Sequence, residues 1–331
     1  MIAKNLSSKY TYFYGFGLFA LFMAVLPQML NSYWTAVFVS VGLGTLLSLS
    51  LNIILGQAGI FHMGHAAFYA VGAYVTAILN TRFGIPIFYL IPLAGIVSAL
   101  FAGLVARPII HLRGDYLLMV TIGIVEIVRI ALVNDIGGLT GGANGLFGIS
   151  RPEFFGIKIK KDVQFYYLIW TFIFATLILF HWLHNSRFGR ALSCIKEDDI
   201  AAEGCGIDVA HYKTAAFMLG AFWAGMAGTL FAAKMTIISP GSFTFWDSVL
   251  LFAAVILGGG SQAGVILGAF IVFGLPEIFR SFADARMLIF GIALMVMMII
   301  RPQGILPPRP RMYVLPSAWI EKLKNRGAKD A

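Results

Sequence analysis

Long apolar runs, separated by short polar connections, occupy most of this chain. Most runs approach the roughly 20 residues that an α-helix needs to cross the hydrocarbon core of a bilayer. The pattern therefore predicts an all-α fold, a polytopic transmembrane helical bundle of about ten spans. We place the spans near residues 11–30, 33–55, 64–80, 86–106, 115–133, 164–183, 213–234, 247–259, 264–280 and 286–300.

The composition supports a membrane protein. Hydrophobic residues make up 59% and charged residues 12% of the 331 residues, too few polar side chains to cover a globular surface. The net charge of +9 comes from basic residues scattered over connections and ends, so we expect no nucleic-acid partner. Cys194 and Cys205 are the only cysteines, which excludes a disulfide framework and indicates a reducing cytoplasmic environment around them.

The distribution of charge orients the bundle. An even number of spans leaves both termini on one side, and most Lys and Arg residues share that side if the termini are cytoplasmic. We therefore expect a transmembrane permease domain over residues 1–312, with a cytoplasmic connection at 184–213 and an outer connection at 134–163. Residues 313–331 then form a basic cytoplasmic tail that contacts anionic lipid.

Residues 187–213 form a long polar connection that carries both signs of charge. Leu192 and Ile195 are three residues apart, as on the buried face of a helix. Asp199 is expected to cap a second short helix, which the glycines that follow would end. Two short helices lying flat under a membrane domain would offer a partner both shape and charge; a solvated connecting loop is the alternative.

A glycine-rich stretch at residues 56–72 is unusual for a plain span. It predicts a broken or re-entrant third helix that lines a pathway, with close helix packing as the alternative. His65 is therefore a candidate pathway residue. His62 and His65 lie three residues apart, but no third ligand is evident nearby, so we expect no metal site.

The fifth span contains Glu126 and Arg129, three residues apart and hence on one helix face. They are expected to pair inside the bilayer, where charges are costly and usually functional. A self-neutralising structural pair and a polar lining for a solute both remain open.

Small residues mark three further segments. The loop GGLTGGANGL at residues 137–146 is expected to be a flexible outer loop, and LGGGSQAG at 257–264 a tight inner turn. The seventh span has a small residue at every fourth position, which predicts a seam for close helix contact. The seam consists of Ala216, Gly220, Ala224, Gly228 and Ala232.

Six segments together resemble the membrane subunits of high-affinity branched-chain amino acid ABC transporters, of the LivM type. The likeness covers residues 40–308, and the six segments in this order are specific. They read GQAGIFHMGHAAFYAVGAY, RGDYLLMVTIGIVEIVR, LTGGANGL, RFGRALSCIKEDDIAAEGCGID, SPGSFTFWDSVLLFAAVILGGGSQAGVILGA and RMLIFGIALMVMMIIRPQGILP.

The resemblance implies a non-enzymatic permease subunit of the bacterial cytoplasmic (inner) membrane that transports leucine, isoleucine and valine. Its implied partners are a second, homologous membrane subunit, two cytoplasmic ATPase subunits, a periplasmic solute-binding protein and membrane lipid. ATP and Mg would be bound by the ATPase subunits, and this chain would hold no cofactor; it contains no GxxxxGK[ST] motif.

The resemblance also makes the 184–213 connection the element that couples the permease to the ATPase. By match to the family motif, coupling is assigned to Arg187, Gly189, Arg190, Glu197, Asp198, Ala202 and Gly206. Glu126 and Arg129 match the family's charged pair, without an implied role. IAAEGCG departs from the glutamate-alanine-alanine signature of many importers, and GGGS is one residue shorter than the family's usual turn, so the details of both contacts stay open.

Other functions remain as alternatives. A urea or short-chain amide permease shares the overall pattern. An ion-coupled secondary transporter usually needs buried carboxylates or broken helices to bind the coupling ion, and only Glu126 among the carboxylates lies deep within a span. A membrane enzyme is the least supported, because no nucleophile–base or metal constellation is evident.

Overall fold

The computed structural model describes most of the chain between residues 17 and 307. The described residues are 17, 19–112, 114–154, 157–159, 161–278, 288, 291–292, 295–296, 299–301 and 303–307. The start of the first expected span, much of the tenth and the whole 313–331 tail therefore lie outside the described residues.

Within the described residues, six helices are long and apolar enough to cross a membrane, which confirms a helical, multi-pass membrane protein. The count of ten spans and the side on which the termini lie stay predictions. The six are α2 with its π-helical extension (Ser32–Gln57), α4 (Ile87–Ile109), α5 (Asp115–Val133), α6 (Asp162–Asn185), α9 (Val209–Met235) and α10 with the turn before it (Pro240–Gly258).

The remaining helices are shorter or more polar. They are Phe19–Met29, α3 (His65–Phe83), α7 (Arg187–Glu197), α8 (Asp199–Gly204), and the run of α11 (Gln262–Ala269), a π-helical turn (Phe270–Gly274) and α12 (Leu275–Ile278). Three 3-10 turns complete the helical elements: Ile136–Gly138, Gly142–Asn144 and Pro240–Ser242.

Two short antiparallel β pairs accompany the otherwise helical fold in the described residues. β1 (Leu146–Phe147) pairs with β4 (Ile237–Ile238), and β2 (Glu153–Phe154) pairs with β3 (Ile157–Lys158). These two-residue strands lie in the connections beyond the helix ends. Their pairing hydrogen-bonds backbone N–H and C=O groups that would otherwise lack partners there.

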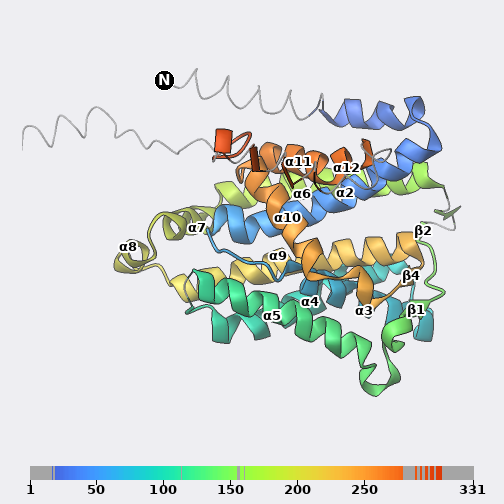
Figure 1. Ribbon diagram of the computed structural model, residues 1–331, viewed down its shortest axis with the longest axis horizontal. Helices are drawn as coiled ribbons and strands as arrows, with labels where there is room; N and C mark the ends of the chain where they lie inside the picture. Colours follow the sequence, from blue (N-terminus) through green and yellow to red (C-terminus); the bar gives the residue numbers. More distant parts are fainter. Residues whose placement is uncertain are drawn as a thin grey trace, which may run out of the picture.

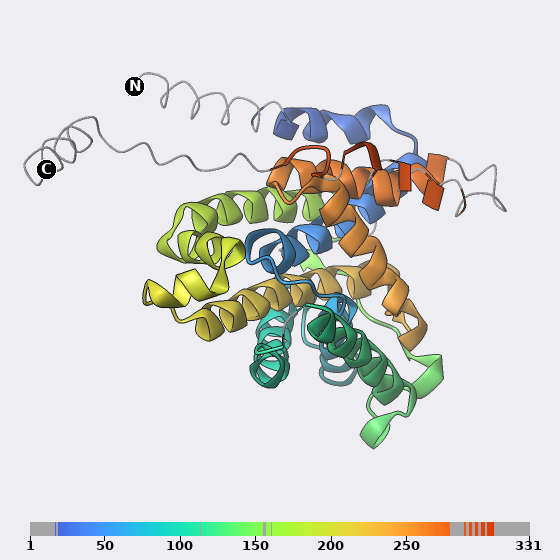
Figure 2. The same cartoon turned by 60° about the vertical axis from the view of Figure 1, so that its left-hand side comes forward.

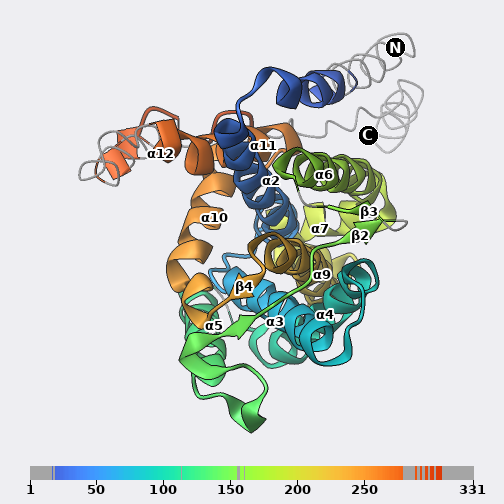
Figure 3. The same ribbon diagram turned by 90° about the vertical axis from the view of Figure 1, so that its right-hand side faces the viewer.

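The long helices run roughly along one axis of the molecule (Figure 1). The helices α7 and α8 project at one end, and the β pairs lie at the other. Figure 3, seen from the strand end, places α9 between α2 and the pair α3 and α4, all of which it contacts. Figure 2 shows the helix Phe19–Met29 and α11 on one side of this core, with α4 and α5 on the opposite side.

Small residues allow α9 to occupy the centre. Gly225 lies so close to α3 that a Cβ added at Gly72 would stand 2.4 Å from the Gly225 Cα atom. A Cβ at Gly228 would stand 2.5 Å from the carbonyl oxygen of Tyr69. The predicted seam is confirmed, since its members Ala216, Gly220, Ala224, Gly228 and Ala232 are all buried.

The loop at residues 137–146 folds around Asp135. The Oδ1 atom of Asp135 accepts hydrogen bonds from the Thr140 amide at 2.7 Å and the Gly141 amide at 3.0 Å. These bonds, led by that from the Thr140 amide, lower the pKa of Asp135 from its usual value. Arg82 in α3 donates to the carbonyl oxygen of Gly138. The loop is therefore built around one carboxylate, and its flexibility and its outer position stay predictions.

Candidate functional site

The helices α7 and α8 lie at the end of the molecule opposite the β pairs (Figure 1). We call them the coupling element, and their end of the molecule the coupling end, after the role predicted for their residues. Ser186 caps α7, and its hydroxyl oxygen accepts from the amide of Gly189 at 3.3 Å. Leu192 and Ile195 are buried, as their spacing predicted. The helix α7 therefore lies with an apolar face on the membrane domain and a charged face outward.

Asp198, rather than Asp199, caps the second short helix. The Asp198 Oδ1 atom accepts from the amides of Ile200 at 2.8 Å and Ala201 at 3.1 Å. Asp199 is instead the first helical residue, and its carboxylate pairs with Lys213 of α9 at 2.5 Å. The prediction was wrong by one residue because the helix begins earlier, and the two carboxylates have separate structural tasks.

The other residues assigned to coupling differ in exposure. Arg187, Arg190 and Glu197 have exposed side chains that can contact a partner. Gly189 and Ala202 are buried within the element. Gly206 is exposed and has a positive φ of 80° that favours glycine, so its part is to shape the backbone after α8.

Lys196 connects this element to the membrane domain, a link that the sequence did not reveal. Its Nζ atom donates to the carbonyl oxygen of Gly56 at 2.8 Å. Gly59 lies beneath the lysine stem, since a Cβ added there would stand 2.9 Å from Lys196 Cγ. Gly59 also has a φ of 71°, so this close approach suits glycine in two ways. Lys196 therefore joins α7 to residues 56–59.

Residues 53–64 interrupt the helical path between α2 and α3. The last turn of α2 is π-helical over Ile53–Gln57, and residues 59–64 have no regular structure before α3 begins at His65. The amide of Met63 donates to Thr121 Oγ1 of α5 at 3.2 Å, and the amide of Ala66 donates to Ser248 Oγ of α10 at 2.9 Å. This irregular backbone thus finds its partners inside the protein, as membrane depth requires. The α3 helix itself is unbroken; the irregular stretch precedes it.

Buried polar atoms gather around this broken segment. The side-chain oxygens of Ser48, Asn52 and Gln57 and both ring nitrogens of His62 are buried and make no hydrogen bond within the described chain. His65 is fully buried, with its Nε2 atom 2.7 Å from Ser50 Oγ. Since buried polar groups are normally hydrogen-bonded, this concentration of unpaired atoms makes the segment a candidate functional site.

The glycine turn at residues 257–264 adjoins the same segment. A Cβ added at Gly260 would stand 3.5 Å from the Gly56 Cα atom. Gly259 also lies against the backbone of residues 303–307, where the amide of Ile305 donates to the carbonyl oxygen of Leu257 at 2.8 Å. The end of α2, the glycine turn and α7 therefore meet at one point of the coupling end.

Glu126 and Arg129 form the predicted ion pair, with Arg129 Nε 2.8 Å from Glu126 Oε2. Their side chains are 36% (Arg129) and 39% (Glu126) exposed. The α5 helix that carries them is poorly covered: 17% of its apolar stretch is buried, compared with 83% for α2. The pair therefore lies on a helix face left open by the described chain.

No metal centre is formed by the residues that the structure describes, since no group of three or more His, Cys, Asp or Glu side chains is close enough to hold an ion. The rings of His62 and His65 are in edge contact, with centroids 5.9 Å apart. Cys194 and Cys205 are exposed free thiols.

Comparison with known proteins identifies the family. The model of the family described as branched-chain amino acid transport system / permease component matches residues 33–301. The high-affinity branched-chain amino acid transport system permease protein LivM of Salmonella typhimurium is 39% identical over 292 residues, 81% of this chain and 68% of that protein. LivM of Escherichia coli K12 is 38% identical, over 86% of this chain and 70% of that protein.

The chain also resembles LivH of Escherichia coli K12, at 26% identity over 86% of this chain and 96% of that protein. No solved structure shows a significant match. The match to the family model and the identity to LivM agree with the helical membrane fold, and this chain belongs to the family of branched-chain amino acid transport permeases.

Proposed function

We propose that this chain is the LivM-type membrane subunit of an ATP-binding-cassette importer and that it carries leucine, isoleucine and valine across the bacterial inner membrane. The observation that carries the proposal is the ion pair of Glu126 and Arg129 on the open face of α5. Charged side chains facing lipid are expensive, so this face belongs against water or protein. A second, homologous membrane subunit placed against α5 would enclose a polar pathway.

The ion pair also suits an amino acid as cargo. A free amino acid carries an ammonium and a carboxylate group, and a Glu–Arg pair offers a partner for each charge. The names of the related permeases point to branched-chain amino acids, whose apolar side chains could follow the apolar remainder of α5.

The other partners are assigned to the two ends of the molecule. We place two cytoplasmic ATPase subunits, which would bind ATP and Mg, on α7 and α8. We place a periplasmic solute-binding protein at the end with the β pairs. Both termini are then cytoplasmic in a bundle of about ten spans. ATP binding would move α7, and the contact from Lys196 to Gly56 would carry that movement to the broken segment.

Uptake assays test the assignment. Cells that lack only this chain should regain energy-dependent uptake of labelled leucine when it is re-expressed. Restored uptake of labelled urea without uptake of leucine would support an importer but change the assigned cargo from branched-chain amino acids to urea. No restored uptake of either, with the chain present in the membrane, would reject the proposal.

Charge reversal tests the docking surface. Glu197→Lys combined with Asp198→Asn should separate ATP hydrolysis from uptake in a folded protein, because both changes remove exposed negative charge facing the proposed ATPase, while asparagine at position 198 can still cap α8. Asp199→Lys is the matched comparison, since that carboxylate pairs with Lys213 inside this chain. Normal coupling of ATP hydrolysis to uptake in the double variant would refute the assignment of α7 and α8 as the surface that binds the ATPase. The purified chain alone should show no ATPase activity.

A further inference from the structure

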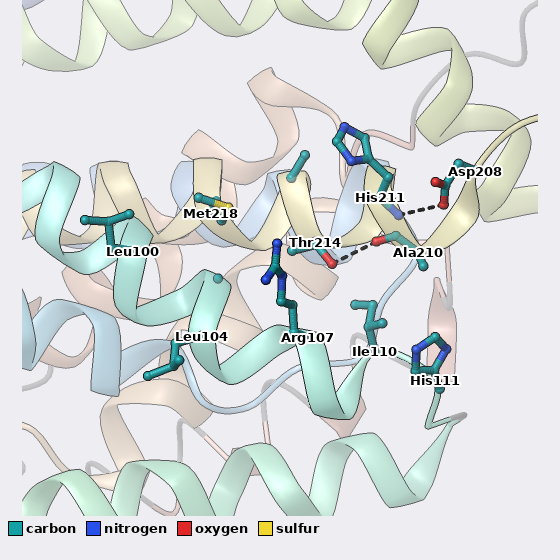
Figure 4. Close-up of a pocket in the computed structure, with 12 residues that line it drawn as sticks. Leu100, Leu104, Arg107, Ile110, His111, Asp208, Ala210, His211, Thr214 and Met218 are labelled. Carbon is teal, nitrogen blue, oxygen red and sulfur yellow. Dashed lines mark hydrogen bonds between the residues drawn. The ribbon is translucent and has the colours of Figure 1, made fainter.

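A groove lies between α4 and α9 at the coupling end of the molecule (Figure 4). Its volume is about 550 Å³. Leu100, Leu104 and Met218 form an apolar wall, and Arg107 stands farther along α4, toward the coupling end. In Figure 4 the guanidinium group of Arg107 points from α4 toward α9. The groove is thus apolar at one end and carries a cation farther along. A phospholipid has the matching arrangement, an apolar acyl chain followed by a phosphate group.

Arg107 gives the groove a free cation. No hydrogen bond joins its guanidinium group to another residue in the described part of the chain. Asp208 is the carboxylate in the lining, and its Oδ1 atom accepts from the amide of His211 at 3.0 Å as the cap of α9. Glu203 lines the adjoining hollow, not this one. Asp208 thus already occupies the amino-terminal end of α9, and the attraction of the groove for an anion rests on Arg107.

An exposed apolar stripe continues from the groove along α4. Leu104 is 74% exposed, Leu100 is 62% exposed, and Tyr89 at the far end is 73% exposed. Helix–helix contacts in membranes favour small residues, and the small residues of α4 lie on its buried face toward α9. Large side chains on an uncovered face instead suit contact with acyl chains. The stripe consists of Tyr89, Leu93, Ile96, Leu100 and Leu104.

We propose that this groove binds one anionic phospholipid, with its phosphate at Arg107 and an acyl chain along the α4 stripe. Arginine and phosphate form bidentate, charge-assisted hydrogen bonds. Basic pockets between helices on the cytoplasmic side are typical sites for anionic headgroups. The inference rests on the proposed function only for the side of the membrane, because it places the headgroup in the same leaflet as α7 and α8.

Native mass spectrometry of the full-length purified chain tests the proposal. The detergent-solubilised chain is titrated with phosphatidylglycerol and, separately, with phosphatidylcholine. One phosphatidylglycerol should bind in preference to phosphatidylcholine. Arg107→Gln should weaken that binding about fivefold, the effect of one basic residue at an anionic surface. Arg107→Lys should retain most of the affinity.

Arg301→Gln is the matched control, because Arg301 is an exposed arginine whose Nη1 atom donates to the carbonyl oxygen of Ile305, outside the groove. It should bind phosphatidylglycerol like the original chain. Equal binding by Arg107→Gln, or no preference for the anionic lipid, would overturn the proposal. So would cross-linking of a Leu104→Cys variant to a second membrane subunit in cells. Because lipid binding is measured without transport, failure here would leave the importer assignment untouched.

Discussion

Replacing Lys196 by methionine should break the connection between the coupling element and the broken segment. Methionine keeps the apolar stem over Gly59 but removes the donor that lies 2.8 Å from the carbonyl oxygen of Gly56. Lys196 is exposed, so we assign this hydrogen bond the ordinary net value of about 1 kcal/mol rather than that of a buried charge. If the bond exists in one transport state only, its loss shifts the equilibrium between states about fivefold.

The assay is ATP hydrolysis and leucine uptake by the assembled complex in the same vesicles. Lys196→Met should lower the uptake per ATP hydrolysed by up to about fivefold, with a smaller change in hydrolysis. Lys213→Met is the matched control, because Lys213 of α9 also bonds to the coupling element, at Asp199, but makes no contact with the broken segment in the described hydrogen bonds. It should reduce assembly without changing the uptake per ATP in complexes that do form.

A second variant approaches the same contact from the other side. Gly59→Ala places a Cβ 2.9 Å from Lys196 Cγ and strains a φ of 71°. If both variants act through one contact, their effects on uptake per ATP should not add. Unchanged uptake per ATP in Lys196→Met, or strictly additive effects in the double variant, would refute a mechanical role for this lysine.

Three further predictions concern the ion pair, the core seam and the outer loop. The single variant Glu126→Gln should impair folding or uptake more than the double variant Glu126→Gln/Arg129→Gln, by about 1–2 kcal/mol, because it leaves Arg129 without its partner in a partly exposed pair. Additive losses would argue against pairing. Gly72→Ala should lower the thermal midpoint of the isolated chain, since overpacking costs about 1–3 kcal/mol, whereas Gly123→Ala meets open space and should not; equal midpoints would contradict the packing. Asp135→Ala should expose the amides of residues 137–146 to hydrogen–deuterium exchange at neutral pH, and equal protection in the variant and the original chain would contradict the role of this carboxylate. In the original chain the protection should persist above the usual pKa of 3.8 and be lost as the pH falls through the lowered pKa.

The sequence predicted those features that depend on local pattern. Apolar runs located the helices within a few residues, because a membrane helix satisfies its own backbone and needs only length and hydropathy. The buried Leu192 and Ile195 and the pair of Glu126 and Arg129 followed from helical spacing in the same way. The seam on α9 was also visible, because small residues recur at the period of helix contact.

Features that depend on distant contacts could not be read from the sequence. Lys196 meets Gly56 across 140 positions, and nothing near either residue indicates the other. The cap on α8 was assigned to Asp199 rather than Asp198, since adjacent carboxylates have the same capping chemistry and only backbone geometry separates them. The hydrogen bonds of the 137–146 loop converge on one carboxylate, which accepts from two backbone amides, and the glycine content of the loop does not indicate this arrangement.

The uncovered faces of α4 and α5 differ in chemistry, and this difference separates lipid from protein. The α4 stripe presents large apolar side chains and reaches a charge only at Arg107, the order expected of a surface against acyl chains. The α5 face carries Glu126 and Arg129 in its second half, together with Gly123, where an added Cβ would meet nothing within 4 Å. An open glycine beside an ion pair suits the close approach of another helix and a polar cargo, and neither feature suits lipid. Single cysteines should therefore cross-link to a second membrane subunit from α5 and not from α4, and the reverse result would exchange the roles of the two faces.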